Sequence, residues 1–196
     1  MIAFDVFGVL ISEGHLISNG LMHLLSSGAD KTLVKQSYEK YNVGAISESE
    51  FWKNIEQEGN YALRGKFLNL FQLDTDFAVI HQLKRDYRLA ILSNFPADWA
   101  TTLMDKFEFD ALFDPIAFSG FVECRKPQPE IYKLLIKKSG LAANQIAFID
   151  DRLENLQTAH DLGMTTIYYQ RENDSHSYRP DMMIQNLKDI ETLFSD

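Results

Sequence analysis

Short apolar segments that end in polar residues constrain the fold of this chain more strongly than any other feature. Three of them lie at 1–5 (MIAFD), 88–94 (RLAILSN) and 145–151 (QIAFIDD). Strands of a parallel sheet have this continuous apolar character, because helices bury both faces of such a sheet. The sequence therefore predicts that these three segments are buried parallel strands.

Helical patterns alternate with further candidate strands along the chain. The additional strands are expected at 114–119 (DPIAFS), at 164–169 (MTTIYY) and, as a short edge strand, at 181–184 (DMMI). Helical apolar spacing occurs at 75–87, 98–107, 129–140 and 152–163. This alternation predicts an α/β fold with a doubly wound, Rossmann-like parallel sheet, closed at the C-terminus by the strand and helix of 178–194.

The segment 14–73 breaks the alternation, because it holds several helical stretches and no convincing strand. Ser47 and Glu50 have the spacing of a capping box at the start of one of these helices. A helical insertion directly after the first strand would lie over the end of that strand, where open α/β sheets bind ligands. We therefore predict a core formed by 1–13 and 74–196 and a small helical unit at 14–73, which is either a packing bundle or a lid.

Charge and cysteine content narrow the partners of the chain. Its 196 residues carry a formal net charge of −9, so nucleic acid and anionic membranes are poor general partners. No apolar run approaches the length of a membrane span. The single cysteine, Cys124, cannot form an internal disulfide, which fits a reducing compartment and leads us to expect a cytoplasmic protein.

Polar residues follow three of the predicted strands. They are Asp5, the pair Ser93-Asn94 and the pair Asp150-Asp151. Each alone is typical of a turn or a helix cap, but the carboxyl ends of parallel strands meet at one edge of the sheet. Carboxylates gathered there repel one another unless a proton or a cation intervenes, and Mg²⁺ bound by carboxylates and a substrate phosphate would relieve that repulsion.

Lys126 is a candidate fixed cation for the same site. Pro127 holds the backbone of Lys126 away from helical geometry, and Pro129 suits the first turn of the following helix. The residue is either a solvated lysine in a loop or the positive partner of a phosphoryl group.

Taken together, these segments resemble the haloacid dehalogenase-like (HAD) hydrolase superfamily. Its four motifs are matched in order by FDVFGVL, ILSN, RKPQPEIY and FIDDRLENLQTAHDLGM, which span nearly the whole chain. The residues of these motifs are similar to those of the subfamily IA branch that contains sugar-1-phosphate phosphatases and the N-terminal phosphatase domain of soluble epoxide hydrolase. The insertion at 14–73 matches the position of the C1 cap in that branch.

The resemblance implies a magnesium-dependent phosphatase that hydrolyses a small phosphorylated metabolite, such as a sugar phosphate. It makes Asp5 the nucleophile that becomes an aspartyl phosphate. It also implies that Ser93 and the backbone of Asn94 bind the phosphoryl oxygens, and that Lys126 neutralises charge on the phosphate and the nucleophile. These roles agree with phosphoryl transfer, which depends chiefly on positioning and charge stabilisation.

The resemblance also implies a set of magnesium ligands. Asp5, Asp151 and the backbone carbonyl of Phe7 would bind Mg²⁺ directly. Asp150 and Asn155 would support the ion, directly or through water.

Phe7 departs from the pattern of the family. Most phosphatases of the superfamily have a second Asp here, which protonates the leaving group and then activates water. A missing general acid typically slows the reaction of a poor leaving group ~10²–10⁴-fold. A phosphatase could manage without this acid, since the resemblance is to a sugar-1-phosphate branch that also tolerates a non-acid there, and a leaving group of low pKa, such as an anomeric hydroxyl, needs less protonation. His15 could be a substitute proton donor, although it could also be an ordinary surface residue.

Two alternatives follow from Phe7. A 2-haloacid dehalogenase would also use Asp5 as its nucleophile; such members of the family also carry an aromatic residue at this position, and halide leaves without a proton. Such enzymes need no metal, however, so the retained Asp150, Asp151 and Asn155 favour the magnesium phosphatase. The other alternative is a weakly active binding protein that keeps the fold.

Substrate choice would depend on the insertion. Its aromatic residues Tyr41, Phe51, Trp52 and Tyr61 are candidates to face a substrate pocket. The burial of large apolar area is what holds a small helical unit together, so we expect these residues to form its core.

Overall fold

The structure is a computed structural model, and it describes residues 1–25, 28–57, 59–171 and 177–194. Its centre is a six-stranded sheet in the order β3-β2-β1-β4-β5-β6, in which all neighbouring strands run parallel. The strands are β1 (Ile2–Phe4), β2 (Leu89–Ser93), β3 (Ile116–Phe118), β4 (Ala147–Asp150), β5 (Thr165–Tyr169) and β6 (Met182–Ile184). The predicted doubly wound α/β fold is confirmed.

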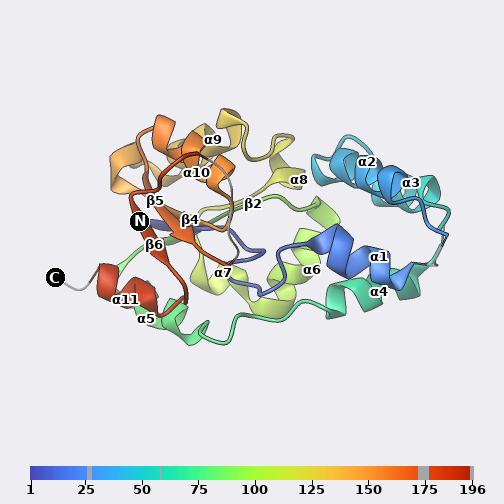
Figure 1. Cartoon of the computed structure of the whole chain (residues 1–196), viewed down its shortest axis with the longest axis horizontal. Coiled ribbons are helices and arrows are strands. Elements are labelled where there is room, and N and C mark those ends of the chain that lie inside the picture. The colour runs from blue at the N-terminus through green and yellow to red at the C-terminus, as the bar shows by residue number, and fades with distance from the viewer. Residues whose placement is uncertain (26–27, 58, 172–176, 195–196) are drawn as a thin grey trace.

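Helices cover both faces of this sheet (Figure 1). The helices that follow the insertion are α5 (Ala78–Asp86), α6 (Ala97–Phe107), α7 (Phe109–Leu112), α8 (Ser119–Val122), α9 (Pro129–Ser139), α10 (Leu153–Asp161) and α11 (Asp189–Leu193), with a 3₁₀ turn η2 (Ala143–Gln145). α9 and α10 lie on one face, and α5, α7 and α11 lie on the other (Figure 1). Pro129 begins α9, and Gly140 ends it with a positive φ, as the sequence predicts.

Successive side chains along each strand point alternately into two hydrophobic cores, one on each face of the sheet. Ile2 and Phe4 of β1 belong to the core on the side of α5, whereas Ala3 belongs to the core beneath α9 and α10. Ile91 and Leu92 of β2 divide in the same way. Successive side chains of a strand point to opposite faces, and here both faces are covered, so the strands show no polar alternation in sequence.

The 14–73 insertion forms a helical unit beside the sheet (Figure 1). Its elements are the π-helical turn η1 (Leu16–Leu21), α1 (Met22–Leu24), α2 (Lys31–Asn42), α3 (Glu48–Asn54) and α4 (Tyr61–Asn69). Ser47 and Glu50 form the predicted capping box of α3. The described part of the insertion contains no strand. Leu73 makes an isolated bridge to Ile11, so the two connections to the sheet run side by side.

Trp99 of α6 joins the insertion to the rest of the molecule. Its fully buried indole ring packs against Tyr41 (5.0 Å between ring centroids), Phe51 (5.5 Å) and Phe67 (5.0 Å) of the insertion. The indole N–H also donates a hydrogen bond to Glu48 Oε1 at 2.7 Å. The hydrophobic core on the α5 side of the sheet therefore continues into the insertion.

The four aromatic residues named from the sequence can be compared with this core. Tyr41, Phe51 and Trp52 are buried and contact other aromatic rings, as expected of core residues. Tyr61 begins α4, but its side chain lies outside the described part of the structure. Among the described residues, no helix combines the length and the apolar character needed to cross a membrane.

Gly120 provides a test of how the insertion side of the sheet is packed. A Cβ atom added at Gly120 would lie 2.2 Å from the backbone nitrogen of Ala97, whereas one added at Gly65 in α4 would meet no atom within 4 Å. We expect Gly120→Ala to lower the free energy of unfolding by about 3 kcal/mol, because the backbone must shift. The matched control Gly65→Ala should raise it by ~0.5–1 kcal/mol, since alanine favours a helix over glycine. Urea denaturation measures both, and a tolerated Gly120→Ala would show that the backbones are not in close contact.

Candidate active site

The ends of β1, β2 and β4 bring the predicted site residues together. Asp5 directly follows β1, Ser93 is the last residue of β2, and Asp150 is the last residue of β4. β1 pairs with both β2 and β4 in parallel register, so the three strand ends are neighbours. One carboxylate oxygen from each of Asp5, Asp150 and Asp151 lies within 4.8 Å of the others.

The carboxylate of Asp5 is oriented through a single oxygen atom. Oδ1 accepts hydrogen bonds from Ser93 Oγ at 2.6 Å and from the backbone N–H of Val6 at 2.7 Å. Lys126 Nζ lies 3.0 Å from the same oxygen. No hydrogen bond between described residues reaches Oδ2. The carboxylate is thus held by one oxygen and leaves the other available for reaction.

Lys126 is a buried cation and not a solvated loop residue. Its Nζ lies 2.6 Å from Asp150 Oδ2, and its side chain is 1% exposed. Burial acts to lower the pKa of Lys126, but the carboxylates of Asp150 and Asp5 outweigh it, so the pKa is raised. The ammonium group therefore keeps its charge at neutral pH.

Both carboxylate oxygens of Asp150 already bind other groups of the protein. Besides Lys126, it accepts hydrogen bonds from the Asn155 side-chain amide at 3.0 and 3.1 Å and from the backbone N–H of Arg152 at 2.8 Å. Burial raises the pKa of Asp150, while Lys126 opposes that shift. These contacts let Asp150 fix the position of the lysine, and they direct the amide nitrogen of Asn155 toward Asp150.

The side chain of Asn94 holds the backbone of Lys126. The Asn94 side chain donates a hydrogen bond to the carbonyl oxygen of Lys126 at 2.9 Å and accepts one from its backbone N–H at 2.8 Å. The resemblance to the family implies that the backbone of Asn94 binds the phosphoryl oxygens. The structure adds a role for its side chain that spacing alone could not indicate, because the partner lies 32 positions away.

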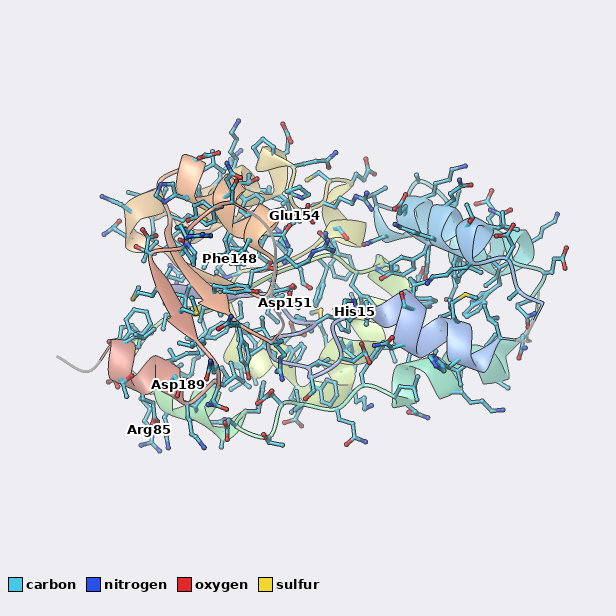
Figure 2. The ribbon with its side chains drawn as sticks, viewed as in Figure 1. His15, Arg85, Phe148, Asp151, Glu154 and Asp189 are labelled. Atoms are coloured by element: carbon cyan, nitrogen blue, oxygen red, sulfur yellow. The ribbon has the colours of Figure 1, made fainter. Side chains whose placement is uncertain are left out.

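Asp151 lies against two glycine residues. A Cβ atom added at Gly8 would lie 2.1 Å from Asp151 Oδ2, and one added at Gly14 would lie 3.1 Å from it. Gly8 has a φ of +81°, so both its conformation and its surroundings require glycine. Figure 2 shows Asp151 between the sheet and the insertion, near His15.

The environment of Asp151 fits a bound cation. Burial, together with the negative charges of Asp150 and Asp5, raises the pKa of Asp151 to about 8. No hydrogen bond between described residues reaches its carboxylate, and no described backbone N–H donates to the Phe7 carbonyl oxygen. Three carboxylates share one lysine, so a hard divalent ion with oxygen ligands would relieve the remaining repulsion.

Phe7 has a structural role. The residue is 5% exposed, and its ring packs against Phe95 (4.6 Å between centroids) and Phe71 (5.1 Å). It therefore belongs to the aromatic core that joins the insertion to the sheet. His15, by contrast, is exposed, and its backbone N–H donates to Glu13 Oε1 at 2.6 Å.

A surface cavity of about 400 Å³ lies between α2 and the loop that precedes Lys126. Its lining includes Glu39 and Lys40 of α2 and Glu123 and Arg125 of the loop. None of the three clustered carboxylates lines this cavity, so it is separate from the acidic cluster.

Comparison with known proteins relates the chain to hydrolases. The sequence model of the haloacid dehalogenase-like hydrolases matches residues 1–163. Drimenol cyclase drtB of Aspergillus calidoustus is 30% identical over 155 residues, which cover 72% of this chain and 29% of that protein. The chain thus spans less than a third of that relative. D-ribitol-5-phosphate phosphatase of Bacteroides thetaiotaomicron is 27% identical over 192 residues, which cover 88% of this chain and 91% of the relative.

Solved structures show the same fold. A HAD-family enzyme from Bacteroides thetaiotaomicron, in complex with magnesium and inorganic phosphate, matches with a TM-score of 0.73 at 21% identity, over 91% of this chain and 98% of the other. The L-2-haloacid dehalogenase of Xanthobacter autotrophicus, with chloropropionic acid covalently bound, matches with a TM-score of 0.72 at 15% identity, over 98% and 96% of the two chains.

The raised pKa of Asp151 predicts how stability depends on pH without divalent ions. Between about pH 4 and pH 8 the folded protein keeps a proton that the unfolded chain releases, so the free energy of unfolding should fall as pH rises. One group contributes at most about 1.4 kcal/mol per pH unit. Asp151→Asn should flatten this slope, as measured by urea denaturation in EDTA.

The control for this prediction is Asp86→Asn, at an exposed position in α5. It should keep the slope of the unchanged protein. An unchanged slope in Asp151→Asn would show that Asp151 is not protonated in this range.

Proposed function

Because the chain belongs to the haloacid dehalogenase-like hydrolase family, we propose that this hydrolase is a magnesium-dependent phosphatase acting on a small phosphorylated metabolite. The observation that carries the proposal is the cluster of Asp5, Asp150 and Asp151 beside the buried Lys126. A phosphoryl group needs compensating charge at its oxygens and a positioned nucleophile, and this cluster supplies both. The similarity to D-ribitol-5-phosphate phosphatase supports phosphorylated carbohydrates as the first substrate class to screen.

In the first proposed step, Asp5 Oδ2 attacks phosphorus. A bond forms between this oxygen and phosphorus while the bond to the leaving oxygen breaks, and the leaving group departs with the electron pair. Ser93 and Lys126 hold Oδ1 during the attack and face the transferring oxygens, together with the Asn94 backbone. A water oxygen then forms a bond to phosphorus while the bond between phosphorus and Asp5 Oδ2 breaks. The electron pair returns to the Asp5 carboxylate, one proton of the water stays on the released phosphate, and the other passes to solvent.

The residues present fit a magnesium ion, which would be held by Asp5, Asp151 and the Phe7 carbonyl. When bound, magnesium supplies positive charge that offsets these carboxylates and the phosphoryl oxygens. Asp150 and Asn155 would support this arrangement from behind, because Asp150 is already bonded to Lys126 and Asn155.

The leaving group receives no proton from Phe7. We therefore propose that the enzyme favours leaving groups that depart readily as anions or that take a proton from solvent. His15 remains the candidate donor from the insertion, since it follows Gly14, and Gly14 lies close to Asp151.

The helical insertion would act as the cap over this site. We propose 14–73 as the cap and 1–13 with 74–196 as the core. The contacts of Trp99 with Phe51, Phe67 and Glu48 support a cap that is docked firmly onto α6.

A 2-haloacid dehalogenase is the second candidate, favoured by the aromatic residue at position 7. In that reaction Asp5 would displace halide from carbon, and water would hydrolyse the resulting ester. The acidic cluster opposes this candidate, because halide displacement requires no magnesium site.

Asp5→Asn tests the nucleophile with little change in shape. Release of phosphate from an aryl phosphate should require Mg²⁺, and Asn at this position should slow it by at least about 10³-fold, as when other covalent nucleophiles are removed. Rapid-quench mass spectrometry should find phosphate on Asp5 in the unchanged enzyme. Chloride release from 2-chloropropionate in EDTA, without any Mg²⁺-dependent phosphatase activity, would instead establish the dehalogenase. Failure of both assays in the folded protein would favour the binding protein.

Phe7→Asp tests the missing general acid, with Phe7→Leu as its matched control. Both variants lose the ring contacts with Phe71 and Phe95, but only Phe7→Asp buries a carboxyl group. The free energy of unfolding should therefore be about 3 kcal/mol lower in Phe7→Asp than in Phe7→Leu. The measurement is the ratio of the hydrolysis rates of an alkyl phosphate and an aryl phosphate, each corrected for the fraction of folded protein. This ratio should be higher in Phe7→Asp than in Phe7→Leu. Equal ratios in the two variants would contradict the proton-transfer role assigned to this position.

A further inference from the structure

We propose that Arg171 is a positioning residue of the active site, which fixes the turn at Gly8 against Asp151 and ties that turn to Asp74 at the base of the insertion. Arg171 lies just beyond β5, and its Nε donates a hydrogen bond to the Gly8 carbonyl oxygen at 2.7 Å. This inference rests on the proposed function, because the turn carries the proposed magnesium ligand at Phe7.

Both peptide groups that flank Gly8 are held. The N–H of Gly8 donates to the carbonyl oxygen of Ile11 at 2.8 Å, which fixes the peptide that carries the Phe7 carbonyl. Arg171 fixes the next peptide through the Gly8 carbonyl. Glycine has no side chain to restrict its dihedral angles, so these two bonds, together with the bond from the Ile11 N–H to the Val6 carbonyl, help to hold Gly8 at a φ of +81°.

The position of Gly8 determines the space for Asp151. The side of the Gly8 Cα on which any other residue would carry its Cβ atom faces the Asp151 carboxylate, so even a methyl group there would overlap Oδ2. A turn that rotates about Gly8 would therefore move the Phe7 carbonyl and press on Asp151 at once. In this way Arg171 acts on two proposed metal ligands without touching either.

The same guanidinium group pairs with a buried carboxylate. Arg171 Nη2 forms an ion pair with Asp74 Oδ2, and the Asp74 side chain is 5% exposed. The ring of Tyr169 lies under the guanidinium, 4.3 Å from its central carbon, and the Tyr169 hydroxyl donates to Asp74 at 3.4 Å. The backbone N–H of Asp74 donates to the Leu10 carbonyl at 2.8 Å. Arg171 thus connects both chain segments that lead into the insertion.

Arginine is required at this position because one side chain serves two acceptors. The guanidinium presents several N–H groups in a fixed plane, whereas lysine offers a single ammonium group on a flexible chain. Lysine could keep the ion pair with Asp74 but would lose the planar contact with the Gly8 carbonyl.

Arg171→Lys is the test, with Arg85→Lys as the matched control at an exposed position in α5, away from Asp151 (Figure 2). Isothermal titration calorimetry with MgCl₂ should show a Mg²⁺ affinity ~10–100-fold weaker in Arg171→Lys, as is typical when a residue that orients metal ligands is lost. The kcat for an aryl phosphate should fall while KM stays near its original value. Arg85→Lys should leave all of these unchanged.

A second variant separates positioning from stability. Arg171→Gln leaves the buried Asp74 carboxylate without its cation and should lower both thermal stability and Mg²⁺ affinity. Asp74→Asn combined with Arg171→Gln removes that unpaired carboxylate and should recover thermal stability without recovering Mg²⁺ affinity. Recovery of both, or an Arg171→Lys protein with the original affinity and kcat, would overturn the inference while the proposed function stands. Absence of Mg²⁺ binding in the unchanged protein would overturn both.

Discussion

The buried ammonium group of Lys126 is the contact on which the site depends. It lies 2.6 Å from Asp150 and 3.0 Å from Asp5, carboxylates at the ends of different strands that would otherwise repel each other. Removal of one partner of a buried ion pair leaves an uncompensated charge and typically costs about 3–5 kcal/mol. One lysine cannot balance three carboxylates, however. The excess falls on Asp151, whose raised pKa reflects its burial beside Asp150 and Asp5. The ion pair that organises the strand ends thereby also creates the demand for a further cation.

The placement of Lys126 is linked to the packing of the insertion. Asn94 holds the Lys126 backbone, and the next residue, Phe95, donates its N–H to Ser119 Oγ at 2.9 Å. The same hydroxyl donates to the backbone carbonyl of Asn42 in α2 at 2.7 Å, inside the protein. A buried polar group costs free energy unless it is hydrogen-bonded, so these three groups hold one another in place. A contiguous set of bonded groups therefore runs from the insertion to the lysine.

The sequence predicted the parts of this site that follow from strand geometry. Asp5, Ser93 and Asp150 end apolar segments, and parallel register alone brings such ends together. It did not predict the partners that approach from elsewhere: Arg171 is 163 positions from Gly8, and no local pattern connects them. Four-residue helices such as α7 and α8 were missed for a different reason, since they are shorter than one repeat of the apolar pattern. The gap between prediction and structure lies in long-range side-chain contacts and not in the order of the elements.

Phe7 shows how two demands compete at one position. The resemblance to the family assigns this position to a general acid, whose carboxyl group must reach the leaving oxygen of the substrate. Here the ring packs against Phe95 and Phe71, and so it belongs to the apolar core that docks the insertion. A carboxyl group placed there would be desolvated, its pKa would rise, and the core would lose ring contacts. An acid at position 7 would therefore weaken the docking of the insertion in this packing. In the proposed reaction, a leaving group that needs a proton would then take it from solvent or from His15, which follows Gly14 and is exposed.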